Sequence, residues 1–238
     1  MENLQSKLKH INKHSECIIL IHGLARTSRC MNKAASLLRI YGYDVINLTY
    51  PSRKKAIGEL VNLYIHPAIK ECESRAYKQI HFLTHSMGGI LLRYYLSTHD
   101  IKNPGKTVML APPNQGSEIV DKIGHLGLFY LLNGPAGRQL GTDKDSVPIQ
   151  LGKLNFEAGI ITGYKSINPL LSLLISGKND GKVAVECAKI KGMKDFLLVP
   201  STHAFIMQRS KVIYQALYFI QQGVFFKPNQ KNQGTKIQ

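Results

Sequence analysis

The chain has 238 residues, of which 44% are hydrophobic and 19% are charged. This length suits one domain with a substantial buried core, and this composition excludes an intrinsically disordered chain. No repeat with a period of roughly 20–50 residues is present, which excludes a solenoid. The 31 Lys and Arg residues outnumber the 15 Asp and Glu residues, so the formal net charge is +16.

The excess of positive charge favours anionic partners in general. The basic residues are spread from Lys7 to Lys236 and do not form runs interleaved with aromatic residues. Three interpretations stay open. We favour a solvated surface, peripheral contact with an anionic membrane surface comes second, and the pattern disfavours nucleic-acid binding.

The amino terminus and the cysteines bear on the compartment. Residues 1–7 are polar and lack the apolar segment of a secretory signal peptide. No apolar stretch reaches the ~20 residues that a membrane span needs. The cysteines have no metal-ligand spacing, so reduced thiols are a simpler expectation than a disulfide pair. We therefore expect a soluble, cytoplasmic protein.

Short apolar runs alternate with helical patterns along most of the chain. Strands are expected at residues 17–21, 43–48, 79–83, 107–110, 170–176 and 196–199. Helices are expected at residues 31–41, 57–73, 87–96 and 212–225, the second kinked or interrupted by Pro67. Such alternation implies crossover connections, so the predicted class is α/β, a mainly parallel sheet of about six strands flanked by helices in three layers.

One long segment interrupts this alternation. Residues 114–168 are rich in Gly and Leu and have weak periodicity, which is typical of a lid or a substrate-binding insertion. Residues 227–238 have no apolar period and are expected to form a flexible tail. The expected organisation is a single domain over residues 1–226 that contains this insertion.

The sequence THSMGG starts at Thr84, between an expected strand and an expected helix. A nucleophile elbow has this setting: a tight turn exposes a serine hydroxyl, and small flanking residues let strand and helix approach. Ser86 is the candidate nucleophile, and Gly88 supplies the small residue at +2. Thr84 stands where the commonest motif has glycine, so this motif is a variant. The alternative is a serine near a helix start, with Gly88 present only for packing.

An acyl-transfer site also needs backbone N–H groups that meet the developing oxyanion. The first expected strand is followed by His22, Gly23 and Leu24, where an elbow-bearing fold places one such donor. Met87 follows the nucleophile at a helix start, where the helix dipole favours negative charge. The N–H groups of Leu24 and Met87 are therefore the expected donors. No G-x-G-x-x-G sequence follows the first strand, which disfavours dinucleotide binding.

A serine nucleophile needs a base, and the base needs an orienting acid. Of the nine histidines, His203 follows the last expected strand, in a loop that is able to project it over the sheet. We predict that His203 is the base. His22, His81 and His85, at strand ends or beside the elbow, are expected to be structural.

Asp180 is the expected acid. It follows the expected strand at residues 170–176, which puts it at the same sheet edge as the elbow. Its Asn-Asp-Gly context also suits a simple turn, which is the alternative interpretation. Asp195 precedes its strand and falls at the opposite edge, and Glu118 and Asp121 are weaker rivals.

The resulting order, Ser86, Asp180 and His203, is the nucleophile–acid–base order of an elbow-bearing fold. The chain resembles the small bacterial lipases and esterases of the α/β-hydrolase superfamily over roughly residues 17–225. The matching segments are IILIHGL (18–24), THSMGG (84–89), PPNQGS (112–117), NDGKV (179–183) and STHAF (201–205).

This resemblance implies an α/β-hydrolase fold and ester hydrolysis without a metal or an organic cofactor. It implies catalytic roles for Ser86, Asp180 and His203 and oxyanion roles for Leu24 and Met87. The implied substrate is a small-molecule acyl ester or a lipid. The shortness of the insertion argues against a large mobile lid.

The acyl group is expected to lie against the apolar part of the insertion, although the same residues also suit plain core packing. These residues are Ile123, Leu126, Leu128, Phe129, Tyr130, Leu131 and Leu132. Three alternatives to an esterase stay open. They are a thioesterase or acyltransferase on the same triad, a catalytically silent binding module, and a surface protein whose function is its charge.

Overall fold

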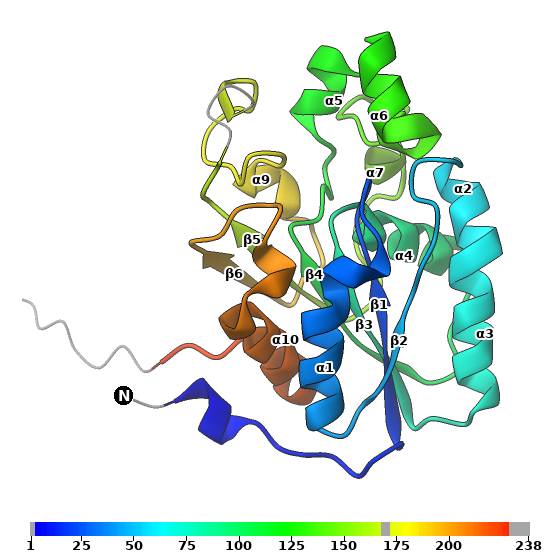
Figure 1. Ribbon diagram of the computed structural model, residues 1–238, viewed down its shortest axis with the longest axis vertical. Helices are drawn as coiled ribbons and strands as arrows, with labels where there is room; N and C mark the ends of the chain where they lie inside the picture. Colours follow the sequence, from blue (N-terminus) through cyan, green and yellow to red (C-terminus); the bar gives the residue numbers. More distant parts are fainter. Residues whose placement is uncertain (1–2, 168–171, 229–238) are drawn as a thin grey trace, which may run out of the picture.

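The computed structural model describes residues 3–167 and 172–228, and these residues form a sheet flanked by helices (Figure 1). The strands are β1 (Glu16–Ile21), β2 (Asp44–Asn47), β3 (Gln79–His85), β4 (Pro104–Leu110), β5 (Ala158–Gly163) and β6 (Asp195–Val199). Their spatial order is β2-β1-β3-β4-β5-β6, and each neighbouring pair is parallel. The predicted α/β class with about six strands is thereby confirmed.

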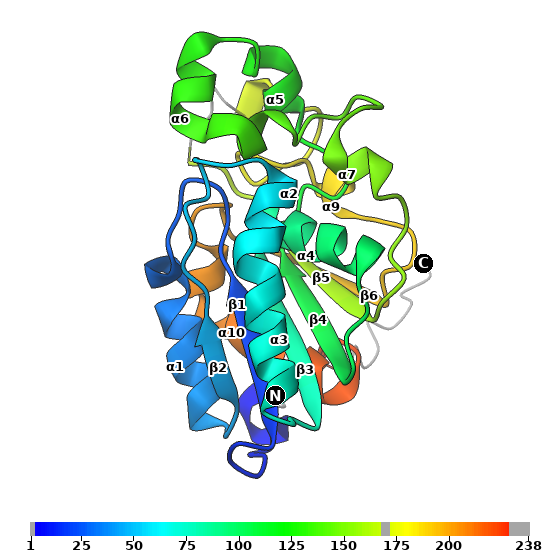
Figure 2. The ribbon, with the colours of Figure 1, turned by 90° about the vertical axis from the view of Figure 1, so that its right-hand side faces the viewer.

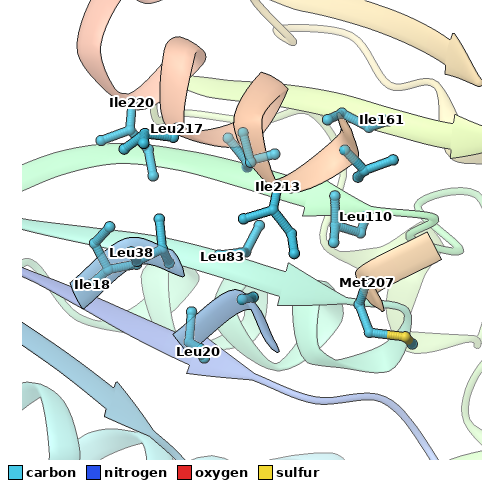
Figure 3. Close-up of a cluster of buried hydrophobic side chains, with 14 of the residues drawn as sticks. Ile18, Leu20, Leu38, Leu83, Leu110, Ile161, Met207, Ile213, Leu217 and Ile220 are labelled. Carbon is cyan, nitrogen blue, oxygen red and sulfur yellow. The ribbon is translucent and has the colours of Figure 1, made fainter. Parts of the chain in front are cut away.

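Strand β1 explains why its sequence is a continuous apolar run. Successive side chains of a strand point to opposite faces, so a strand covered on both sides must be apolar throughout. Ile18 and Leu20 belong to the core on one face, and Ile19 and Ile21 belong to the core on the other. Figure 3 shows the first of these cores, between the sheet and its covering helices.

Two groups of helices cover the sheet. One face packs against α1 (Asn32–Ile40) and α10 (Ser210–Gln222). The other face packs against α2 (Ile57–Leu60), a π-helical turn (Val61–Ile65), α3 (His66–Ser74) and α4 (Met87–Thr98). These helices agree with the predicted ones to within a few residues at most ends.

The interruption expected at Pro67 takes the form of the π-helical turn. Proline has no N–H and clashes with the carbonyl four residues before it, so a regular α-helix does not pass through it. Here the N–H of His66 donates to the carbonyl of Val61, five residues back. The widened turn lets the chain stay helical from Ile57 to Ser74.

The predicted strand at residues 170–176 is wrong where the structure describes it. Residues 172–174 are helical or in a turn, and Leu173 is 81% exposed, while residues 168–171 lie outside the described part. The fifth strand is β5, inside the segment 114–168 that was predicted as an insertion. The glycines of β5 weaken the apolar pattern by which a strand is predicted. A Cβ on Gly159 would lie 2.6 Å from the ring of Phe219, so the packing of α10 requires glycine at this position. The insertion therefore ends before residue 158.

The insertion carries short helices at the carboxyl end of the sheet. They are α5 (Glu118–Ile123), α6 (Gly127–Arg138) and α7 (Val147–Gln150). In Figure 2, α5 and α6 stand together beyond the layers that flank the sheet. Other short helices with described bounds are α9 (Val185–Ala188) and the 3₁₀ segments Leu4–Lys7, Ser28–Met31 and Ile206–Gln208.

Two other expectations concern the ends and the cysteines. Of the predicted tail, residues 229–238 lie outside the described part. The four cysteines are free thiols, and the sulfur atoms of Cys17 and Cys72 lie 3.3 Å apart in the core. Throughout residues 3–167 and 172–228, no helix combines the length and the apolar character needed to cross a membrane.

A buried arginine ties the insertion to α4. Arg93 is 3% exposed, and burial lowers its pKa to about 10. Its guanidinium donates to the backbone and side-chain oxygens of Asn114, at 2.9 and 3.2 Å, and to the carbonyls of Pro148 and Gly152, at 3.0 and 2.7 Å. One side chain thus fixes the segment after β4 and the end of α7.

Replacing Arg93 by methionine should destabilise the protein by roughly 3 kcal/mol, because each buried acceptor left without a donor costs about 1–3 kcal/mol. Urea unfolding followed by circular dichroism would measure this loss. The exposed Arg29 is the matched control, and Arg29→Met should change the free energy of unfolding by less than about 0.5 kcal/mol. Equal stability of the two variants would contradict this role of Arg93.

Candidate active site

The site starts at the turn between β3 and α4. Ser86 is the single residue between them, and its backbone has φ 52° and ψ −124°, in a region that non-glycine residues rarely occupy. Its N–H donates to the carbonyl of Leu110 at 2.8 Å, which fixes the turn to the end of β4. This is the geometry of a nucleophile elbow, which exposes a serine hydroxyl above the sheet.

Small residues make this turn sterically feasible. A Cβ on Gly88 would lie 2.3 Å from the carbonyl oxygen of Ile21, so α4 approaches β1 too closely for any other residue. Thr84, the departure from the commonest motif, is fully buried beside α4. A Cβ on Gly89 would lie 3.2 Å from its hydroxyl oxygen. The glycine at 89 therefore provides the room that the threonine at 84 takes up.

The structure brings Ser86, His203 and Asp180 together. Nε2 of His203 lies 3.0 Å from Oγ of Ser86, and Nδ1 lies 2.8 Å from Oδ2 of Asp180. Because an ionised carboxylate only accepts hydrogen bonds, Nδ1 carries the proton and donates it. Nε2 is then unprotonated and accepts from the serine hydroxyl. The three side chains therefore form a continuous hydrogen-bonded chain from the hydroxyl through the imidazole to the carboxylate.

Asp180 is held by a tight turn of its own segment. Its side chain is buried, and its Oδ1 accepts hydrogen bonds from the N–H groups of Lys182 and Val183, at 3.0 and 2.9 Å. Its carbonyl accepts from the N–H of His203 at 3.0 Å. The turn alternative and the acid role are therefore compatible, because the turn orients the carboxylate toward the imidazole. Asp180 lies 17 residues after β5 and does not directly follow a strand.

His85 contacts the backbone of His203. It is 1% exposed, and burial lowers the pKa of its imidazole well below the ordinary value, so the ring is neutral. Its Nε2 lies 3.0 Å from the carbonyl oxygen of His203 and donates to it. The two rings lie 5.0 Å apart. His85 therefore fixes the backbone that carries His203, the kind of structural role expected for it.

The loop after β1 carries the first expected oxyanion donor. His22 stacks on Tyr50 with 4.0 Å between the rings, and the Tyr50 hydroxyl donates to the His22 carbonyl. Leu24 follows in this fixed loop and lines the same pocket as Ser86, while Met87 begins α4. Throughout the described residues, neither the Leu24 N–H nor the Met87 N–H donates to a protein acceptor. Sequence reasoning missed Tyr50, since a lone tyrosine carries no motif.

A pocket of about 270 Å³ opens above Ser86 and His203. Its walls come largely from α5, α6 and the segment between them. The apolar lining residues from there are Ile119, Val120, Ile123, Leu126, Leu128, Phe129 and Leu132. Five of the seven residues that were expected to contact an acyl group therefore lie in the wall, while Tyr130 and Leu131 do not line it and are 47% and 75% exposed.

The rival carboxylates lie elsewhere. Asp195 begins β6, at the edge of the sheet opposite to the site, and accepts from the backbone of Phe225 and from Lys227. Glu118 accepts from Ser176, and Asp121 accepts from Thr142. These partners keep all three away from the imidazole of His203, whose Nδ1 contacts Asp180.

Several solved structures with the same architecture are lipases and esterases. The mature lipase of Bacillus licheniformis superposes with a TM-score of 0.66 at 18% identity, over 84% of this chain and 89% of that one. A metagenome-derived lipolytic enzyme gives 0.60 at 14% identity, over 89% and 95%. A metagenomic carboxyl esterase gives 0.61 at 17% identity, over 81% and 66%. In sequence, the chain matches no protein-family model and no curated protein. The chain has the α/β-hydrolase fold.

The close approach of α4 to β1 predicts that Gly88→Ala destabilises the protein by about 2–4 kcal/mol, because the added methyl group meets backbone that has little room to move. Gly127→Ala is the control, since a Cβ there would have no neighbour within 4 Å. Thermal unfolding of both variants measures the difference. A Gly88→Ala protein with the same melting temperature as the wild type would refute the steric account of the elbow.

Proposed function

We propose that this chain of the α/β-hydrolase fold is a serine hydrolase that cleaves carboxylic esters through an acyl-enzyme on Ser86. One observation carries the proposal. The Ser86 hydroxyl lies 3.0 Å from His203, which is itself oriented by a buried carboxylate, and all of this opens into an apolar pocket. The lipolytic and esterase activities named for structures of the same fold support it.

In the proposed acylation, Nε2 of His203 accepts the proton of Ser86 as Oγ attacks the ester carbonyl. The carbonyl oxygen becomes an oxyanion and is met by the N–H groups of Leu24 and Met87. The positive end of the α4 dipole adds to this stabilisation. The intermediate then collapses, the carbon–oxygen bond to the alcohol breaks, and His203 gives its proton to the departing alcohol.

In the proposed deacylation, water takes the place of the alcohol. His203 accepts a proton from this water as it attacks the acyl-enzyme, and the same two N–H groups hold the second oxyanion. Collapse releases the carboxylic acid and returns the proton to Ser86. Asp180 keeps its charge throughout and stabilises the imidazolium that forms twice in each cycle.

The apolar lining of the pocket supports the proposal that the acyl group of the substrate binds there. Apolar side chains of α5 and α6 form one wall next to Ser86, and an apolar ligand gains about 25 cal/mol for each Å² removed from water. A volume of about 270 Å³ suits a short or medium acyl chain better than a whole triacylglycerol. The same triad is also able to cleave a thioester or to transfer the acyl group to another alcohol.

We also propose peripheral contact with an anionic membrane surface, through α6. Leu128 and Leu131 are 66% and 75% exposed there. Arg138 lies over the ring of Tyr130, and Arg53 donates to the carbonyl of Leu132, so cationic groups border these leucines. Exposed apolar side chains bordered by cations are typical of surfaces that rest on anionic lipid.

Replacing Ser86 by alanine should lower kcat/KM for p-nitrophenyl butyrate by at least about 10³-fold, because no nucleophile is left. Asp180→Asn should lower it by about 10⁴-fold, through loss of the required imidazole tautomer. The exposed Ser74→Ala variant on α3 is the control and should retain wild-type activity. Full activity of Ser86→Ala would defeat the assignment. Parallel assays with butyryl thioesters and acceptor alcohols separate the related acyl chemistries.

Membrane contact predicts that Leu131→Ser weakens binding to phosphatidylglycerol vesicles by about fivefold to tenfold, the size expected for one exposed leucine that enters lipid. Leu63→Ser on the π-helical turn, where the side chain is 53% exposed, is the control and should bind as the wild type does. Co-sedimentation measures both. Equal binding of the two variants would contradict a docking role for α6.

A further inference from the structure

Two cations line the candidate active-site pocket beside the reacting groups. Arg26 comes two residues after Leu24, and Lys182 comes two residues after Asp180, so each is carried by a loop that also supplies part of the site. Both residues are exposed to solvent, and both line the pocket. The described residues that line this pocket include no aspartate or glutamate.

The backbone of Lys182 is held firmly although its side chain is exposed. Its N–H donates to Oδ1 of Asp180 at 3.0 Å, and its carbonyl accepts from the hydroxyl of Ser117 at 3.0 Å. In the described part of the chain, Asp180 is otherwise engaged by Val183 and by His203, and it is buried beneath the pocket. Lys182 therefore lines the pocket from a fixed backbone anchor.

The two cations that line the pocket repel each other. Partial burial of the ammonium lowers the pKa of Lys182, and repulsion by Arg26 lowers it further, while the carboxylate of Asp180 opposes the shift. The same two cations contribute to the lowered pKa of His85, after burial and His203. Among the described side chains, neither Arg26 nor Lys182 forms an ion pair with a carboxylate. Such a pair is relieved when an anion binds between its members.

We propose that Arg26 and Lys182 form an anion subsite that takes a phosphate group carried by the alcohol part of the ester substrate. This inference rests on the proposed ester hydrolysis. In the proposed function the acyl group packs against the apolar wall of α5 and α6. The alcohol part of the ester is therefore the part that contacts Arg26 and Lys182. Arginine binds phosphate oxygens through a planar pair of donors and lysine binds them as a point charge, so together they suit a phosphate dianion. The substrate class is therefore a phosphorylated acyl ester, such as an acylglycerol phosphate, and the net charge of +16 favours its approach.

The test compares two soluble esters with one acyl chain, 1-hexanoylglycerol 3-phosphate and 1-hexanoylglycerol, below the concentrations at which they aggregate. The quantity measured is the ratio of kcat/KM for the phosphorylated ester to kcat/KM for the neutral one. We expect a ratio of about 100 for the wild type, and a loss of about tenfold for each of Arg26→Gln and Lys182→Gln, mainly through KM. Lys33→Gln, an exposed cation of α1 outside the pocket, is the control and should keep the wild-type ratio.

The anion subsite is overturned if the neutral ester is hydrolysed, the ratio of the two kcat/KM values is near one, and neither variant changes this ratio. In that case the proposed ester hydrolysis stands without the subsite. Failure to cleave either ester, together with failure to cleave p-nitrophenyl butyrate, overturns both proposals. A second measurement separates the sources of phosphate. Glycerol 3-phosphate should inhibit hydrolysis of the neutral ester competitively and more strongly than inorganic phosphate. Equal inhibition by the two would make this a site for free phosphate and overturn the substrate assignment.

Discussion

The site depends on one constraint, the conversion of β3 into α4 within a single residue. Ser86 accepts a backbone conformation that costs about 1–3 kcal/mol, and its surroundings have to hold it there. The bond from its N–H to the Leu110 carbonyl and the space left by Gly88 provide this support. The strained turn places the hydroxyl at the carboxyl end of the sheet and starts α4 immediately behind it, so the proposed nucleophile and one proposed oxyanion donor come from adjacent residues.

The order of the strands brings the other groups to the same place. β1 and β3 are neighbours in the sheet although β2 lies between them in sequence, so the loops after both strands meet at the point where the direction of strand addition reverses. Ligand sites of open parallel sheets lie at such points. The loop after β1 brings Leu24 and Arg26, and the turn of β3 brings Ser86. The long connection from β5 to β6 and the loop after β6 bring Asp180 and His203.

The candidate triad was predictable from the sequence because each member has a local pattern or a position that topology constrains. Ser86 lies in a strand–turn–helix motif, and His203 follows the last strand of a parallel sheet. Asp180 was found for a partly wrong reason, since the strand expected before it does not exist in the described residues. β5 was not predicted from the sequence, because Gly159 and Gly163 weaken its apolar pattern. At Gly163 a Cβ would lie 2.2 Å from the Ser201 carbonyl oxygen, so this glycine allows the loop that carries His203 to cross the strand end. Tyr50 has no local sequence pattern, because its role depends on a contact with His22, 28 residues earlier in the chain.

The most direct measurement of the central claim is covalent labelling by a fluorophosphonate, which reacts only with a serine whose hydroxyl is activated by a neighbouring base. Labelled protein would be digested and the modified peptide sequenced by mass spectrometry. The account predicts a single modified residue, Ser86, and loss of labelling in His203→Ala while the protein stays folded. Absence of labelling in the wild type, or a label on a different serine, would contradict it.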